Sequence, residues 1–248
     1  MRKYKTIPGW AAMLTAACLF TSAVALAAPD TEKTETEKQG ALSELNADKV
    51  EYNMKTGQMT AEGNVVIRYD GGVAKGAFVT FNTKTYQGEM TGGVVADKED
   101  MHLDCDRVEI HSQTKMVAIG NVHGRKQDKR VEGPVVEYDS GEEYARLPQG
   151  GLLATKDGTF TADYMEGWMK TEVAKAVGNA HVISPPKNFE GGGDEAEYFG
   201  KDSGKLVLTG NAWAVQDNNT LKSGRLTVFL QEQDKAETVA DEKGQAEQ

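Results

Sequence analysis

The chain has 248 residues, a formal net charge of −10 and a mean hydropathy of −0.53. Proteins that bind nucleic acid present clustered Lys and Arg to the phosphates, so this acidic balance excludes nucleic acid as an expected partner. The length is sufficient for one or two domains with an apolar core.

The first 27 residues have the pattern of a secretory signal peptide. Three basic residues stand within the first five positions, and residues 10–26 are uncharged and mostly apolar. Ala25-Leu26-Ala27 supplies the small residues of a cleavage site, which predicts a periplasmic mature chain that begins at Ala28. A leader kept as a membrane anchor is the alternative. Cleavage moves the formal charge from −10 to −13 and leaves a single thiol, Cys105, which excludes an internal disulfide.

Two polar segments flank the rest of the chain. Residues 28–41 contain a run of Thr, Glu and Lys, which predicts a disordered acidic linker. Residues 231–248 are rich in Glu, Asp, Lys and Gln and contain no aromatic residue, which predicts an acidic tail that is disordered or forms a short helix. The predicted fold therefore occupies residues 42–230.

An apolar-polar-apolar triplet recurs through this region. Its seven copies begin 29, 29, 28, 29, 31 and 30 residues apart, at 50–52, 79–81, 108–110, 136–138, 165–167, 196–198 and 226–228. A period of two with Glu or Thr at the centre sends the flanking side chains to one face of a strand and the polar one to the other. Seven copies of one unit predict an all-β repeat architecture.

A glycine accompanies the triplet at a nearly fixed distance. It follows the start of each of the first six triplets by 12 to 14 residues, at Gly63, Gly92, Gly120, Gly150, Gly178 and Gly210. Such a glycine predicts a bend, where φ is positive or another backbone approaches closely. The pattern therefore predicts a solenoid-like stack of about seven strand repeats, each ~29 residues long, around a continuous apolar interior.

Motifs that would indicate catalysis are missing from the sequence. It contains no Gly-x-Ser-x-Gly elbow and no His-Glu-x-x-His pair. The richest cluster of reactive groups is His102, Asp104, Cys105, Asp106 and His111. On a strand, His102, Asp104 and Asp106 share one face and Cys105 points to the other, so we expect no metal site. We also expect no enzymatic activity and no cofactor.

The apolar interior is the remaining candidate for a site. Met and Trp mingle there with many Ala and Gly, which leaves room for a flexible ligand. The alternative is that these residues pack only against one another. The residues expected to line an apolar groove are Tyr52, Met59, Ile67, Phe78, Phe81, Ile110, Tyr138, Leu153, Phe160, Met165, Trp168, Tyr198, Leu208, Trp213, Leu226 and Phe229.

Four strings in the repeat region resemble the OstA-like family. They are ADKVEY at 47–52, AEGNVV at 61–66, LVLTGN at 206–211 and LKSGRLTVF at 221–229. The resemblance covers about residues 42–230 and allows two consecutive OstA-like units. It implies an elongated, twisted and slightly open β-jelly roll with a hydrophobic groove. The implied function is to shield the acyl chains of lipopolysaccharide during its export, as the soluble periplasmic member of the family does.

The resemblance also implies partners. These are lipopolysaccharide or a related glycolipid, an LptC-like protein at the inner membrane and an LptD-like protein at the outer membrane. Like domains of the family join end to end, so we expect head-to-tail contacts through exposed strands near Val50 and Leu226. Two alternatives stay open: a β-solenoid enzyme that modifies polysaccharide, and a structural or adhesive repeat protein without a ligand.

Overall fold

The computed structural model describes residues 42–69, 71–156, 158–168, 170–171, 173–200, 203–230 and 237–240. The predicted leader and linker, residues 1–41, lie outside this part of the chain. The described residues form two compact units. The N-terminal unit contains residues 42–127 and 134–142, and the C-terminal unit contains the described residues of 128–133 and 143–248.

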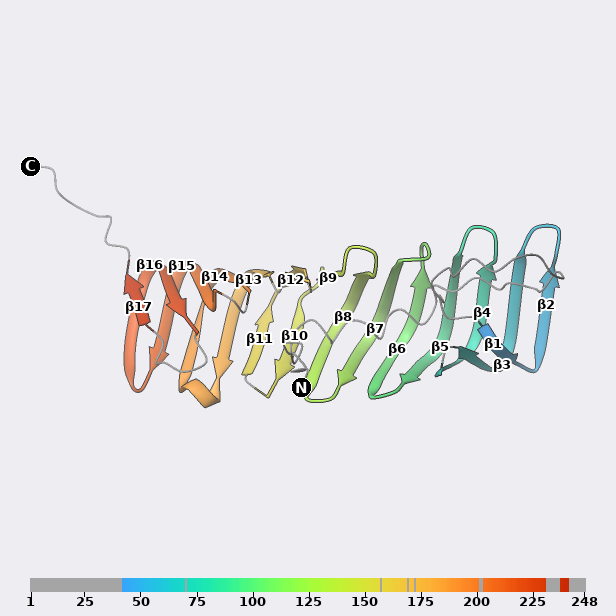
Figure 1. Cartoon of the computed structure of the whole chain (residues 1–248), viewed down its shortest axis with the longest axis horizontal. Coiled ribbons are helices and arrows are strands. Elements are labelled where there is room, and N and C mark those ends of the chain that lie inside the picture. The colour runs from blue at the N-terminus through green and yellow to red at the C-terminus, as the bar shows by residue number, and fades with distance from the viewer. Residues whose placement is uncertain are drawn as a thin grey trace, which may run out of the picture. The chain divides into compact units, whose positions relative to one another are not determined.

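Strands make up nearly all of the N-terminal unit (Figure 1). They are β1 (Leu42–Asn46), β2 (Lys49–Asn53), β3 (Gln58–Tyr69), β4 (Gly72–Asn82), β5 (Gln87–Lys98), β6 (Met101–Ile110), β7 (Lys115–Lys126) and the second half of β8 (Lys129–Asp139). From β2 to β7, each strand pairs antiparallel with the next one along the chain. β1 also pairs with β3, beside the half of β3 that β2 leaves uncovered.

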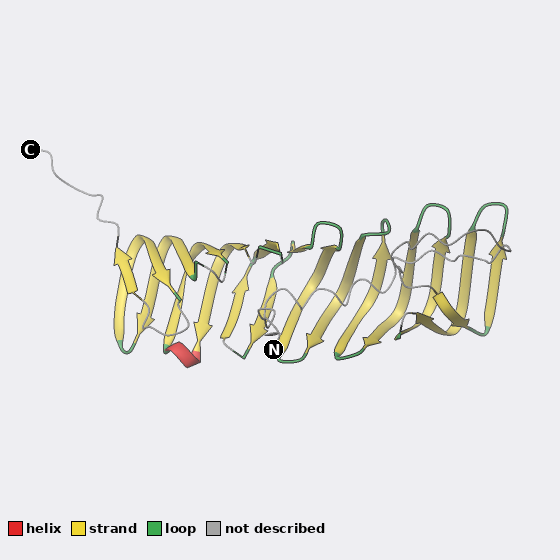
Figure 2. Ribbon diagram, viewed as in Figure 1, coloured by secondary structure: helices red, strands yellow, loops and turns green. Residues whose placement is uncertain are grey.

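The C-terminal unit repeats this arrangement with four shorter strands at its start. Its strands are β9 (Tyr144–Leu147), β10 (Gly151–Thr155), β11 (Gly158–Ala162), β12 (Tyr164–Trp168), β13 (Val173–Ser184), β14 (Phe189–Phe199), β15 (Lys205–Gln216), β16 (Asn219–Phe229) and β17 (Glu237–Ala240). β11 and β12 pair with successive halves of β13, and β13 to β17 pair in chain order. A 3-10 turn, Pro185–Lys187, connects β13 to β14 (Figure 2). The predicted all-β repeat fold is confirmed.

Strand β17 corrects two expectations. Residues 237–240 pair with Leu226 to Phe229 of β16, so this part of the predicted disordered or helical tail is a strand. The edge near Leu226 is therefore covered, and Leu226 itself is buried. The composition of the tail does not reveal this strand because edge pairing depends on backbone groups rather than on side-chain type.

The triplets form the core, as predicted. Directly paired residues point to the same face of a sheet, so cross-strand pairs extend the triplets into rows of apolar side chains. We call this side the core face and the opposite side the outer face. One row of the N-terminal unit consists of Val50, Ala61, Val79, Met90, Val108 and Ala118, and one row of the C-terminal unit consists of Met165, Ala176, Ala196, Leu208 and Leu226. All of these except Val50, on the edge strand β2, are buried.

Five of the six repeated glycines stand at bulges, and the sixth, Gly150, lies in the connection between β9 and β10, which agrees with the predicted bend. All six have positive φ, between 70° and 88°. At Gly178 and Asn179 of β13, for example, two residues face the single residue Asp194 of β14. A bulge of two residues against one bends the strand, and Ala176 and Ala180 on either side of this bulge both lie in the core.

Candidate functional site

Seven of the residues predicted to line a groove are deeply buried on the core face. Each is at most 8% exposed. Such side chains are closed off by their own contacts and stabilise the sheet through apolar burial, worth ~0.8 kcal/mol per methylene. They are Phe81, Ile110, Tyr138, Phe160, Met165, Leu208 and Leu226.

A second group lies on the core face and remains partly accessible. Leu153 pairs with the buried Phe160, and Tyr198 pairs with the buried Leu206, yet neither Leu153 nor Tyr198 is itself buried. Met59 and Ile67 on β3 have the same intermediate exposure, and Tyr52 on β2 is 40% exposed. These five side chains are the predicted residues that present apolar surface on the side of the core.

The remaining four predicted residues lie on the outer face. Phe78 precedes the buried Val79, and Trp213 stands between the buried Ala212 and Ala214. Trp168 and Phe229 likewise alternate with buried triplet residues. Because successive residues of a strand point to opposite faces, these four do not meet the other twelve.

The strongest cluster of reactive groups divides between the faces, as predicted. His102 Nδ1 lies 2.6 Å from Asp97 Oδ1 and His102 Nε2 lies 3.6 Å from Asp104 Oδ2, all on the outer face. Cys105 is buried on the core face opposite Val94, where desolvation raises the pKa of its thiol to about 11. Within the described ranges, no group of three or more His, Cys, Asp and Glu side chains is placed to hold a metal ion.

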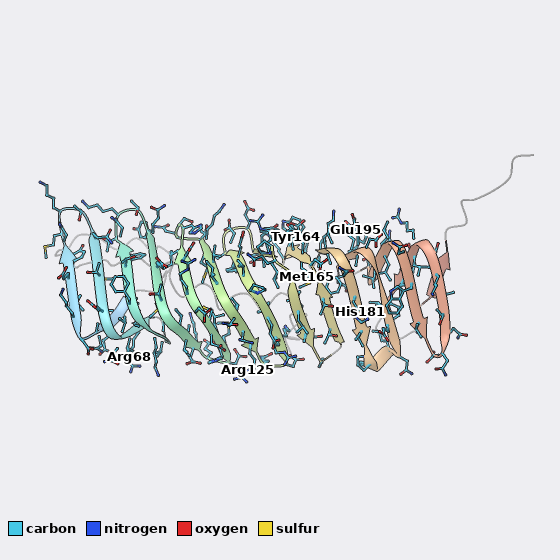
Figure 3. The ribbon with its side chains drawn as sticks, turned by 180° about the vertical axis from the view of Figure 1, so that it is seen from behind. Arg68, Arg125, Tyr164, Met165, His181 and Glu195 are labelled. Atoms are coloured by element: carbon cyan, nitrogen blue, oxygen red, sulfur yellow. The ribbon has the colours of Figure 1, made fainter. Side chains whose placement is uncertain are left out.

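The structure also brings together residues that the sequence did not single out. Tyr144 of β9 and Tyr164 of β12 both donate their hydroxyls to Oε2 of Glu166, at 2.5 and 2.6 Å. These hydrogen bonds lower the pKa of the Glu166 carboxyl, first through Tyr144 and then through Tyr164. Desolvation and the same carboxylate raise the pKa of both phenols. Tyr164 and Glu166 stand on either side of the buried Met165 along β12, so this group lies on the outer face (Figure 3).

The ring of Tyr144 also contacts Trp168. Their ring centroids are 5.1 Å apart and their planes are tilted by 48°, a favourable arrangement for an aromatic pair. The only sequence signal for this group was the alternation around the triplet at 165–167, which places Tyr164, Glu166 and Trp168 on one face. Tyr144 reaches them through the pairing of β9 with β12, which no local pattern predicts.

No helix in the described part of the chain is both long and apolar enough to cross a membrane. The strand pairing, the bulges and the buried apolar rows together define a class: an antiparallel β-repeat protein with a bulge in most repeats and an apolar core face. The sequence model of the family described as "LptA/(LptD N-terminal domain) LPS transport protein" matches residues 73–234, more than half of the chain. The chain belongs to this family.

Two individual proteins show a weaker similarity. The "LPS-assembly protein LptD" of Nitrosomonas eutropha (strain DSM 101675 / C91 / Nm57) is 24% identical over 112 residues, which cover 45% of this chain and 14% of that protein. The crystal structure of "LptH, the LptA homologous periplasmic component of the conserved lipopolysaccharide transport device from Pseudomonas aeruginosa" matches 58% of this chain and 94% of that one. It does so at 12% identity and a TM-score of 0.33, which is too low to support an argument from shared geometry.

Proposed function

We propose that this protein carries lipopolysaccharide or a related glycolipid through the periplasm. Its core face shields the acyl chains from water while the saccharide remains hydrated. In this role the protein helps to bridge the inner and outer membranes during lipopolysaccharide export, and it binds and conducts its ligand rather than catalysing a reaction. Membership of the lipopolysaccharide transport family supports this proposal.

The apolar core face, which presents partly accessible side chains beside its buried rows, is the observation that carries the proposal. In each unit the rows run from strand to strand, and small residues such as Ala61, Ala118 and Ala196 are interspersed with larger ones. An acyl chain exposed to water loses ~0.8 kcal/mol per methylene, so a chain of about a dozen carbons faces ~10 kcal/mol. Repeated and similar apolar contacts remove this barrier without creating one deep site that would trap the lipid.

The partly accessible core-face residues are the positions where we place contact with acyl chains. Met59 and Ile67 serve the N-terminal unit, Leu153 and Tyr198 serve the C-terminal unit, and Tyr52 extends the surface onto β2. The four residues on the outer face are left out of this proposal. The seven deeply buried residues support the sheet behind the contact surface.

The N-terminal edge supports the proposed assembly with other proteins. All five residues of β2 are exposed, including Val50 at 47%, and the residue register gives β2 one partner strand, β3, within the described ranges. An exposed edge strand is a template for a strand of another chain. We propose that an LptC-like or LptD-like protein, or the end of a second copy, pairs there.

Adjacent leucines of β10 offer a direct test. Leu153 lies on the core face opposite Phe160, whereas Leu152 pairs with Thr161 on the outer face, and both have intermediate exposure. A photo-crosslinking amino acid at 153 should capture radiolabelled lipopolysaccharide, and the same group at 152 should not. Met59 and its outward neighbour Thr60 provide the matched pair in the N-terminal unit.

Each result of this test is decisive. Adducts at positions 59 and 153 alone support the proposal, as does lipopolysaccharide retained by the purified protein in native mass spectrometry. Equal labelling at all four positions, or no lipid adduct at any of them, overturns it.

A further inference from the structure

A row of apolar side chains follows one margin of the C-terminal unit on its outer face. Each member is the first or last residue of its strand: Tyr144 begins β9, Trp168 ends β12, Val173 begins β13, Phe199 ends β14 and Phe229 ends β16. Trp168 pairs directly with Tyr144 and with Val173, and Val173 pairs with Phe199. We call this row the aromatic margin. Trp168 and Phe199 are 39% and 37% exposed, so ring surface there faces water.

Charged groups accompany the aromatic margin on the same face. Glu166 lies two residues before Trp168 and pairs directly with Arg146 and Lys175. Lys205 holds its ammonium 4.8 Å from the centre of the Phe199 ring. The charged side chains therefore flank the aromatic margin: Glu166, Arg146 and Lys175 form the neighbouring row, and Lys205 pairs with Phe229 at the end of the margin.

The carboxylate of Glu166 is held in place beside these rings. Both tyrosine hydroxyls bond to Oε2, so the position of the carboxylate is fixed by two short hydrogen bonds. A carboxylate accepts about four hydrogen bonds over its two oxygens, so Oε1 keeps the capacity to accept from a ligand. The side chain is thus an ionised acceptor of fixed direction next to exposed aromatic faces.

This combination fits a pyranose sugar. A sugar ring presents apolar C–H groups that pack on an aromatic face and hydroxyls that bond to fixed polar groups, as ligand sites generally require. A protein partner would bury ~800 Å² on each side, against which this narrow row flanked by charges is a poor match. An anionic lipid surface is opposed by the formal charge of −10.

We propose that Tyr144, Trp168 and Glu166 bind a pyranose unit in the saccharide of the carried glycolipid, with Arg146 and Lys175 as neighbouring donors. The inference rests on the proposed function, because it places the saccharide at a strand margin while the acyl chains contact the core face. The aromatic margin thereby gives the hydrated part of the ligand a weak site of its own.

Calorimetric titration of the full chain tests the assignment with three probes: oligosaccharide released from lipopolysaccharide by mild acid, intact lipopolysaccharide, and a phospholipid that contains no sugar. Trp168→Leu keeps an apolar side chain but removes the ring, and Glu166→Gln keeps the shape but removes the charge. We expect either change to weaken oligosaccharide binding at least tenfold and to leave phospholipid binding unchanged. Trp213→Leu is the matched control, because Trp213 lies on the same face beside His181, away from Glu166.

The outcomes separate this inference from the proposed function. If wild type does not bind the oligosaccharide, or if Trp168→Leu and Trp213→Leu weaken it equally, the saccharide site is refuted even when the lipids still bind. If the oligosaccharide binds through Trp168 and neither lipid binds, the site stands and lipid carriage is refuted. Circular dichroism of each variant establishes that the sheet is intact.

Discussion

Asn121 on β7 donates its side-chain amide to the carboxylate of Asp106 on β6, at 3.1 Å to Oδ2 and 3.4 Å to Oδ1. The same relationship recurs at three other bulges, where Asn64, Asn179 and Asn211 bond to Asp48, Asp163 and Asp194. In the second and fourth repeats, Gly93 and Gly151 take the place of Asn, and Ala77 and Pro134 take the place of Asp. The two polar residues thus occur together, which indicates that they stabilise the bulge as a pair.

Removing one member of this pair should lower the stability slightly, and the effect of removing the second member should depend on whether the first is still present. We expect Asp106→Ala to lower the free energy of unfolding by about 1 kcal/mol, the usual worth of such a hydrogen bond. Adding Asn121→Gly should then cost nothing further, because the amide has already lost its acceptor and Gly tolerates the φ of 45° at that position. Urea unfolding of the four chains of this cycle measures the coupling, and strictly additive losses would contradict the pairing.

Two glycines with nearly the same φ allow the cost of the left-handed backbone conformation to be measured separately from the cost of steric overlap with a neighbour. Gly93 has φ 76° and open space where a Cβ would stand, whereas Gly120 has φ 77° and its Cβ would overlap the Asp106 carboxylate. Gly93→Ala should therefore cost about 1–2 kcal/mol, from the left-handed conformation alone. Gly120→Ala should cost clearly more in the same urea experiment. Equal losses would show that the contact with Asp106 does not limit the site.

The buried thiol of Cys105 should be unreactive in the folded protein. With its pKa raised to about 11, the thiolate fraction at pH 8 is roughly 100-fold below that of an ordinary thiol. A thiol-specific chromogenic reagent should label it only after urea unfolds the sheet. Because the unfolded chain loses this proton first as the pH rises, the group should also reduce stability between about pH 9 and pH 11. Cys105→Ala should lack that decline, and rapid labelling without urea would contradict the burial.

The carboxylate of Glu166 should contribute a stability that acid removes. Its pKa is lowered in the folded state, so its contribution is present above the ordinary value of 4.5 and is lost as the pH falls through the folded value. Wild type should therefore exceed Glu166→Gln in stability at pH 7, and the difference should shrink towards pH 3. Glu195→Gln, an exposed position on β14, is the control. A difference that stays constant with pH would show that the tyrosine bonds do not depend on the charge.

Proline in β2 should distinguish assembly from folding. The Asp48 N–H donates to the Gly63 carbonyl, so the alternation of an antiparallel pair directs the Val50 N–H towards β3 and the Glu51 N–H away from it. Glu51→Pro should reduce the self-associated fraction in sedimentation velocity while the unfolding transition stays in place. Val50→Pro should lower the transition itself, because it removes a ladder hydrogen bond. Association that survives Glu51→Pro would place the contact elsewhere.

The alternation of apolar and polar residues was sufficient to predict the fold, but it did not identify most residues of the candidate site. The triplets correctly predicted that Val79, Val108 and Leu226 lie in the core. The repeated glycines correctly predicted positions where φ is positive. The predicted groove mixed the two faces because Phe78 and Trp213 were chosen for their apolar character, although each adjoins a residue that alternation sends inward. Sorting every residue by its distance from the nearest triplet would have placed both outside.

Long-range pairing explains what the sequence could not reveal. The Tyr144 hydroxyl meets Glu166 across a separation of 22 residues, through the short strands β9 and β12. Strand β17 is only four residues long and pairs with β16 at the edge. Neither arrangement leaves a periodic trace in its own segment, so both depend on the completed sheet.

Pairing between successive strands also sets how chains of this kind differ in length. A duplicated repeat of ~29 residues would add two strands whose apolar residues continue the existing rows, because each strand relies mainly on its immediate neighbours. A single inserted residue within a strand would instead turn every later side chain of that strand to the wrong face. Copy number is therefore the variable through which evolution can lengthen or shorten chains of this kind while the pairing within each repeat stays the same.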